Sequence, residues 1–140
     1  MRNRPPLSEL RQIYSDTTTI AVVGASPDPT KKAHSIPKYL HENGYRVIPV
    51  NPKHDQILGL TAYPTLLDIP EPVDVVDVFR PAAETPAVAE QAVQIGAKVL
   101  WLQLGIVSRE AEAIAAAAGM TVVMDTCMGA MHAKLGLSSG

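Results

Sequence analysis

Cysteine is almost missing from this sequence, with Cys127 as the only one. A single thiol cannot form an internal disulfide, and it lacks the companion ligands of a structural zinc site. The four histidines are dispersed, without the spacing of metal ligands. The sequence therefore predicts no metal site, and it assigns the stability of the fold to an apolar core.

Aromatic residues, a charge excess and long apolar runs are also lacking. Aromatics make up 4% of the chain, too few for base-stacking platforms, and a net charge of −2 gives no broad positive field. Nucleic acid is therefore not expected as a partner. No apolar segment approaches the length of a membrane span, and none follows the basic residues 1–6. We expect a cytoplasmic protein that does not contact membranes.

What is present is a regular alternation of strand and helix signals. A length of 140 residues predicts one domain over 1–140, with a core at about 17–136. Continuous apolar runs are typical of strands covered on both faces, and segments of helical spacing that stop at glycine are typical of helices. The strands are expected at 19–24, 45–50, 73–79, 99–102 and 121–124, and the helices at 7–14, from about 36 to 43, 86–95, 108–118 and 129–135, before a free end at 138–140.

This alternation predicts an α/β fold, a Rossmann-like doubly wound parallel sheet of five main strands flanked by helices. Counted along the chain, the expected strand order is 3-2-1-4-5. Asp74 and Asp77 are interpreted as charges on an edge strand, without a chemical role. Ligands of such sheets bind beyond the carboxyl ends of the strands, where the chain reverses direction, here between the first and fourth strands.

The loop after the first strand is the first candidate for phosphate binding. Gly24 closes the strand, but the second and third glycines of the dinucleotide fingerprint are missing. The loop instead carries Ser26, Lys31, Lys32 and Ser35, ahead of a helix that is expected to begin near Ile36-Pro37. A helix amino end presents free N–H groups to a phosphate. The alternative is a solvated connector whose lysines face water.

The next loops offer weaker signals. The second strand ends at Asn51-Pro52-Lys53, without the carboxylate that binds the ribose in NAD sites. Lys53 could meet a ribose phosphate, which coenzyme A and NADP both carry, or it could be an exposed charge beside a plain turn. Phe79 could flank an adenine or belong to the core, and Arg80 could meet a phosphate or a partner acid.

The last two loops hold no catalytic set. Gln103 and Gly105 follow the apolar strand that contains Trp101 and could approach a ligand. A nucleophilic Cys127 would need a base such as His132 or His34 nearby, which no spacing ensures. The preferred interpretation is a half-buried structural cysteine. No catalytic residue is predicted.

Five sequence blocks together resemble a known family. They read VGASPDP at 23–29, GYRVIPVNP at 44–52, PVDVVDVFRP at 72–81, WLQLGI at 101–106 and VVMDTCM at 122–128. The chain is similar to stand-alone CoA-binding domains, which are related to the amino-terminal CoA-binding domain of the succinyl-CoA synthetase α subunit.

The resemblance implies a Rossmann-like fold with coenzyme A across the carboxyl ends of the strands. It implies pyrophosphate contacts from Gly24, Ala25, Ser26, Lys31 and Ser35, an adenosine end near Asn51, Pro52 and Lys53, and further contacts from Phe79, Arg80, Gln103 and Gly105. The synthetase's phosphorylated histidine belongs to a second domain, so ligase activity is not expected. The family's usual basic residue and final His-Lys or His-Arg pair are replaced by His132-Ala133-Lys134, so no role is expected for His132.

The resulting expectation is a non-catalytic module that binds coenzyme A or an acyl-CoA, a small-molecule cofactor. The alternatives are a small NADP-dependent oxidoreductase or nucleotide-sensing domain, and an interaction domain without a ligand. The missing fingerprint argues against the oxidoreductase, and the lysines of the first loop argue against the interaction domain. No motif identifies a protein partner or an acyl group.

Overall fold

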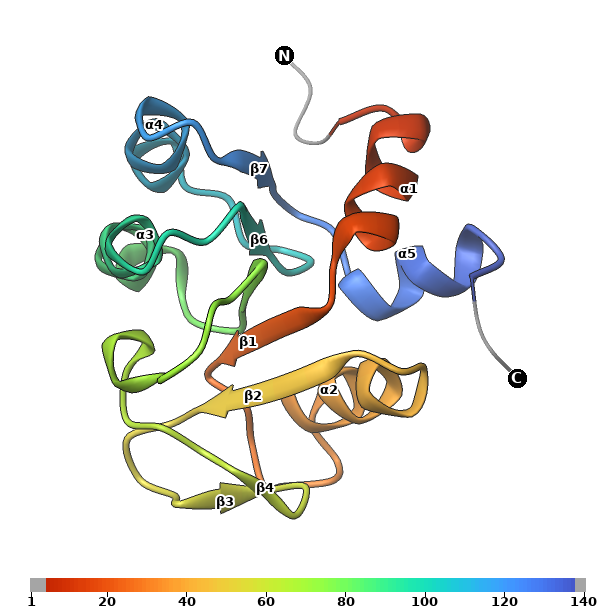
Figure 1. The fold of residues 1–140 in the computed structure, drawn as a ribbon, viewed down its shortest axis with the longest axis vertical. Coiled ribbons are helices and arrows are strands. Elements are labelled where there is room, and N and C mark those ends of the chain that lie inside the picture. Colours follow the sequence, from red (N-terminus) through yellow and green to blue (C-terminus); the bar gives the residue numbers. More distant parts are fainter. Residues whose placement is uncertain (1–4, 138–140) are drawn as a thin grey trace.

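A computed structural model describes residues 5–137, so the expected free end at 138–140 and the basic residues 1–4 lie outside it (Figure 1). Its central feature is a parallel sheet of five strands, which confirms the predicted Rossmann-like α/β class. The strands are β1 (Thr19–Val23), β2 (Arg46–Val50), β5 (Val75–Val78), β6 (Val99–Leu102) and β7 (Thr121–Val123).

The predicted strand order is wrong. The sheet runs β2-β1-β5-β6-β7, which is 2-1-3-4-5 when the strands are counted along the chain. The third strand is therefore internal rather than at the edge, and every residue of Val75–Val78 is buried. Three valines in four positions indicate a strand covered on both faces, but they do not indicate which strands lie beside it, because the edge strand β2 is also largely buried. The reversal that opens a ligand site consequently lies between β1 and β5.

The two acidic residues taken as edge markers have internal partners instead. Asp74 Oδ2 accepts hydrogen bonds from the backbone N–H groups of Thr18 and Thr19, both at 2.9 Å. Asp77 lies in the middle of β5, opposite Val22 of β1 and Trp101 of β6, and is fully buried. Neither residue protects an edge.

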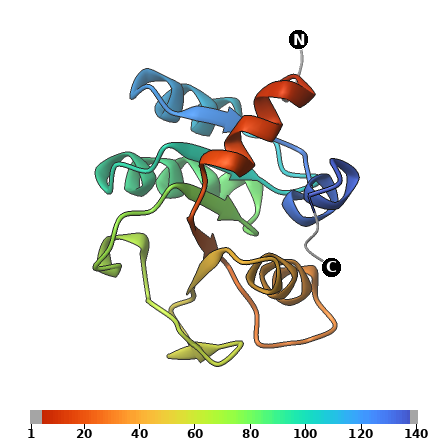
Figure 2. The ribbon, with the colours of Figure 1, turned by 45° about the vertical axis from the view of Figure 1, so that its right-hand side comes forward.

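Helices cover both faces of the sheet. Figures 1 and 2 show α3 and α4 on one side, with α1, α2 and α5 on the other. The first group packs its alanines closely on Ala21, Val76 and Leu100, and the second packs larger side chains on Ile20 and Trp101. The helices are α1 (Leu7–Asp16), α2 (Lys32–Glu42), α3 (Thr85–Gln94), α4 (Arg109–Ala117) and α5 (Met128–Lys134).

Helix α2 begins about one turn earlier than predicted, at Lys32, and contains Pro37. Proline has no N–H, so the Ala33 carbonyl four residues earlier receives no bond from it. The N–H of Ser26 donates to that carbonyl at 3.0 Å. Pro37 therefore leaves the Ala33 carbonyl free to accept the bond from Ser26, and this bond attaches the loop after β1 to α2.

Residues 51–74 connect β2 to β5 without a long helix. The segment forms a short antiparallel pair, β3 (Gln56–Ile57) with β4 (Leu60–Thr61), and a 3-10 turn, η1 (Leu66–Asp68). A second 3-10 turn, η2 (Ala82–Glu84), precedes α3.

Across residues 5–137, no helix combines the length and apolar character needed to cross a bilayer.

Candidate functional site

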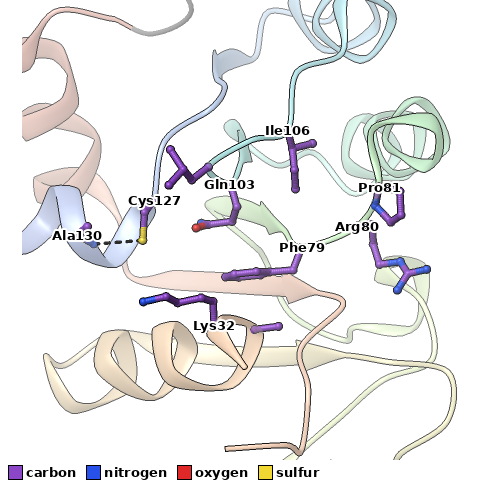
Figure 3. A pocket seen from close by; sticks show the side chains of 10 residues that line it. Lys32, Phe79, Arg80, Pro81, Gln103, Ile106, Cys127 and Ala130 are labelled. Atoms are coloured by element: carbon purple, nitrogen blue, oxygen red, sulfur yellow. Dashed lines mark hydrogen bonds between the residues drawn. The ribbon is translucent and has the colours of Figure 1, made fainter. Parts of the chain in front are cut away.

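A cavity of about 600 Å³ lies at the carboxyl ends of β5 and β6, between the first turns of α2 and α5 (Figure 3). Its volume is within the range of small-molecule sites, and most of its wall is apolar. The lining comes from the two helices and the loops after β5, β6 and β7: Lys32, Ala33, Phe79, Arg80, Pro81, Gln103, Leu104, Ile106, Cys127 and Ala130.

Three of the predicted site residues, Phe79, Arg80 and Gln103, line this cavity. The Phe79 ring also packs against the core, as one of its two interpretations predicted, and the contact with an adenine stays a prediction. Arg80 forms a two-pronged ion pair with Glu84, with Nε–Oε1 at 3.0 Å and Nη2–Oε2 at 2.8 Å. Figure 3 shows its guanidinium turned away from Gln103 and Cys127. Arg80 therefore meets a carboxylate of its own chain in this structure.

Gly24 is required for loop packing. Its φ is +87°, and a Cβ placed there would lie 2.7 Å from the carbonyl oxygen of Phe79 and 2.8 Å from Cδ of Arg80. The side-chain position is thus filled by the loop after β5. The pyrophosphate contact that the resemblance implies for Gly24 stays a prediction, and in this structure the residue lets the loop after β5 pack closely on the loop after β1.

The other first-loop residues divide between scaffold and surface. Ala25 is fully buried. Ser26 is held from two sides, by its N–H bond to Ala33 and by its carbonyl, which lies 2.9 Å from Nδ1 of His34. Lys31 and Ser35 are exposed and do not line the cavity. The lysine that lines it is Lys32, the first residue of α2, where amide N–H groups point outward.

Asn51 joins the first and second loops. Its Nδ2 donates to the Ala25 carbonyl at 2.9 Å, and its Oδ1 accepts from the Lys53 N–H at 2.8 Å. Both ends of its side chain are engaged in holding the backbone. Pro52 and Lys53 are exposed, and none of the three lines the cavity. The predicted adenosine-end group therefore lies on the surface at the β2 edge of the sheet.

Gly105 belongs to a third loop contact. Its N–H donates to Oδ1 of Asp125 at 2.7 Å, joining the loops after β6 and β7. Asp125 itself has a φ of +54°. Gly105 is exposed beside the cavity but does not line it, whereas its neighbours Leu104 and Ile106 do.

A buried polar pair lies beneath the cavity. Gln103 is 4% exposed, and its Nε2 donates to Oδ1 of Asp77. The other carboxylate oxygen, Oδ2, has no hydrogen-bond partner among the described residues. Burial raises the pKa of Asp77 from 3.8 to about 7, although the Gln103 bond opposes the shift. Sequence reasoning gave Asp77 no role because it placed the strand at an edge.

His132 is enclosed by tyrosines and does not line the cavity. Its ring meets those of Tyr14, Tyr39 and Tyr45 edge-on, and its Nδ1 lies 2.9 Å from the Tyr39 hydroxyl. Burial lowers its pKa below the usual 6.5. The Tyr14 hydroxyl donates to the Met128 carbonyl at 2.6 Å. This cluster fixes α5 against α1 and α2, and so positions the cavity wall.

Cys127 lines the cavity and caps α5. Its Sγ accepts from the Ala130 N–H at 3.4 Å, and the side chain is partly exposed. Sequence reasoning treated the residue as structural and left it out of the site. Its place directly after the fifth strand could have indicated the cavity, because this fold directs such loops toward the ligand.

The remaining residues that sequence reasoning missed are mostly apolar: Ala33, Pro81, Leu104, Ile106 and Ala130. No local signal separates a cavity-lining alanine or leucine from one that faces the core or solvent. Lys32 was noted in the first loop, but the resemblance implied a contact from Lys31 instead. Within residues 5–137, no three metal-ligating side chains gather into a metal site.

Comparison with known proteins gives consistent matches over nearly the whole chain. Residues 18–133 match the CoA binding domain family. Protein YneT of Bacillus subtilis, described as uncharacterized, is 40% identical over 92% of this chain and 96% of its own. The solved structure of a hypothetical protein from Pyrococcus horikoshii OT3 is 42% identical, with a TM-score of 0.91, covering 96% of this chain and 98% of that one.

A larger enzyme matches in one part only. Acetate–CoA ligase (ADP-forming) I of Archaeoglobus fulgidus is 30% identical over 86% of this chain, but the match spans 19% of the ligase. The rest of that enzyme has no counterpart in the aligned region. The likeness therefore concerns one portion of the ligase and does not extend to its whole reaction.

Proposed function

We propose that this chain, which belongs to the CoA binding domain family, binds coenzyme A or an acyl-CoA at the carboxyl ends of its parallel strands. The observation that carries the proposal is the cavity itself, a largely apolar space of about 600 Å³ at the reversal of the sheet, bordered by Lys32 and the amino end of α2.

The chemistry of the cavity suits the two parts of this ligand. Pyrophosphate is favoured by the first-turn amides of α2 and the charge of Lys32, with Lys31 next to it on the surface. The pantetheine arm is a flexible chain with two amides, which suits apolar walls and one polar side chain, Gln103. The adenosine end extends toward Asn51, Pro52 and Lys53 in this proposal.

The proposed role is binding without catalysis. Cys127 is the nucleophilic side chain among the cavity-lining residues, and its Sγ has a backbone N–H as its hydrogen-bond partner, not a side-chain base. His132 is packed among tyrosines and His34 is bonded to the Ser26 carbonyl. The arrangement lacks the paired nucleophile and base of an acyl-transfer site. We expect no hydrolysis of acyl-CoA.

A variant that fills the cavity tests the proposal. Ala130 on α5 lines the cavity, and Ala133 is exposed on the same helix without lining it. Ala130→Leu should lower CoA affinity at least about tenfold, because about three added carbons occupy ligand space. Ala133→Leu adds the same carbons outside the cavity and should leave affinity unchanged. Isothermal titration calorimetry measures both, with NADPH as the competing nucleotide.

Thermal unfolding provides a second measurement on the same samples. CoA at about 100 times its Kd stabilises a native protein by about 2.7 kcal/mol, which raises the melting temperature of a domain of this size by several degrees. NADPH should not produce this shift. Equal binding of CoA by Ala130→Leu and the wild type would place the site elsewhere, and a preference for NADPH would overturn the proposed ligand.

A further inference from the structure

The orientation of the Gln103 carboxamide is fixed from below. Gln103 lines the cavity although it is only 4% exposed, and its Nε2 donates to Asp77 in the core. An amide group that turns its nitrogen inward turns its oxygen outward. Figure 3 shows this oxygen on the side of Cys127 and Lys32, facing the space between them. No described residue donates to it.

Holding Gln103 with a buried carboxylate lowers the stability of the fold. Asp77 is fully buried in β5 between Val22 and Trp101, and its Oδ2 has no partner among residues 5–137. A buried carboxylate with one unsatisfied oxygen opposes folding, and a valine would continue the strand without that penalty. A carboxylate does have one property that an amide lacks. It only accepts hydrogen bonds, so it admits only the nitrogen end of Gln103.

We propose that Asp77 is a positioning residue, which holds Gln103 so that its Oε1 faces the cavity as an acceptor for an N–H group of the ligand. The inference rests on the proposed function, because the N–H group it assigns is an amide of the pantetheine arm of CoA. Gln103 contacts the ligand, and Asp77 acts through Gln103. The cavity thereby prefers a donor at this wall over an acceptor.

The protonation of Asp77 near pH 7 can be followed separately from that of its titratable neighbour. The facing titratable group is Tyr14 of α1, whose pKa burial and Asp77 both raise, so it stays neutral near pH 7. The Tyr14 ring contacts Trp101 of β6 and His132 of α5. Protonated Asp77 can also donate a hydrogen bond, so it can pair with either end of the Gln103 amide, donating to Oε1 or accepting from Nε2. The orientation with Gln103 Oε1 facing the cavity is consequently most populated above neutral pH, where Asp77 is ionised.

Four proteins test the proposal by calorimetry: the wild type, Asp77→Asn, Gln103→Met and the double variant. The asparagine side chain is isosteric with aspartate but can pair with either end of the amide, so the competent orientation falls to about half and CoA affinity falls about twofold. Methionine keeps the length of glutamine without its amide and should lose about fivefold. Asp77→Asn should then have no effect in the Gln103→Met background. Gln94→Met, on the exposed face of α3, is the matched control.

Two further measurements separate positioning from packing. Between pH 8 and pH 6 the wild type should lose about twofold in CoA affinity relative to Asp77→Asn, because only the wild type changes protonation at this position. Adenosine 3′,5′-bisphosphate, which lacks the pantetheine arm, should bind all four proteins equally. The proposal would be overturned if Asp77→Asn lowered CoA affinity equally in the wild type and in Gln103→Met. It would also be overturned if the variants lost as much affinity for the bisphosphate as for CoA.

A measurement without ligand keeps the two proposals distinguishable. The side-chain amide signals of Gln103 in ¹⁵N-labelled protein should move with pH around neutrality in the wild type and stay constant in Asp77→Asn. Absence of CoA binding by the wild type overturns the proposed function, with these signals still reporting the pairing. Gln103 signals that respond neither to pH nor to Asp77→Asn overturn the inference even if CoA binds. The double variant, which removes the buried charge together with its partner, covers the case in which Gln103→Met alone does not fold.

Discussion

Lys53 is an exposed residue whose proposed role is a contact with the ligand outside the cavity. It lies in the turn that Asn51 organises after β2, and it does not line the cavity. Its proposed role depends on a part of the ligand that extends along the surface, the phosphate on the adenosine ribose. The competing candidate Arg80 is paired with Glu84, which leaves Lys31 as the better alternative.

The proposed role of Lys53 predicts a specific change in ligand preference. The wild type should prefer CoA over dephospho-CoA about fivefold, a modest ratio because water screens an exposed ion pair. Lys53→Ala should bind the two ligands almost equally, and the wild-type preference should shrink in high salt. Lys38→Ala removes an exposed lysine from α2 as the control. If Lys53→Ala keeps the full preference, the same titration with Lys31→Ala is the next measurement.

At the scale of elements, the site is built by contacts between loops. Asn51 joins the loops after β1 and β2, Gly24 joins those after β1 and β5, and Gly105 joins those after β6 and β7. The Ser26–Ala33 bond attaches the first loop to α2. Several residues predicted to contact a ligand therefore act first on each other. They shape the loops that the ligand would meet.

A pair of glycines separates backbone strain from loop packing. Gly24 and Gly44 have similar φ values, +87° and +96°, but a Cβ at Gly44 would meet nothing within 4 Å. Gly44→Ala should lower the free energy of unfolding by about 1 kcal/mol through backbone strain alone. Gly24→Ala should lower it by about 3 kcal/mol, because its Cβ also displaces the loop after β5. Urea denaturation measures both, and equal losses would show that the loops separate without cost.

At the scale of the whole molecule, two buried groups give opposite dependences of stability on pH. The pKa of Asp77 is raised to about 7, so the native state binds its proton first and gains stability as pH falls from about 8. The pKa of His132 is lowered, so the unfolded state binds that proton first and stability is lost below pH 6.5. Both effects arise from burial of the titrating side chain.

Asp77→Asn should isolate the first of these contributions. At pH 8 the variant should be more stable than the wild type by about 2–4 kcal/mol, since it carries no buried charge. The difference should shrink as pH falls to 5.5, because Asp77 becomes neutral, while the His132 contribution is common to both proteins and cancels. Urea denaturation across this pH range measures the difference. A constant difference would mean that Asp77 does not titrate near neutrality.

The local pattern determined the elements and the family. Runs such as 19–24 and 99–102 are apolar without alternation, and Gly44, Gly96 and Gly119 directly follow the helices or their caps. These signals depend on neighbours along the chain, so they can be read without knowing the fold. The same is true of the five sequence blocks, and the family they suggested is confirmed over residues 18–133.

Only the tertiary structure decided which strand lies beside which, and the site follows from that choice. Placing β5 between β1 and β6 buries Asp77, brings Gln103 over it and sets Phe79 against Gly24. Sequence reasoning selected the loops after β5 and β6, which line the cavity, together with the loop after β2, which does not. It could not divide the residues of these loops among cavity, scaffold and surface. Local sequence fixes the direction of a side chain relative to its own strand. What that side chain meets depends on strands and helices far away in the chain, whose arrangement is settled when the apolar faces are buried together.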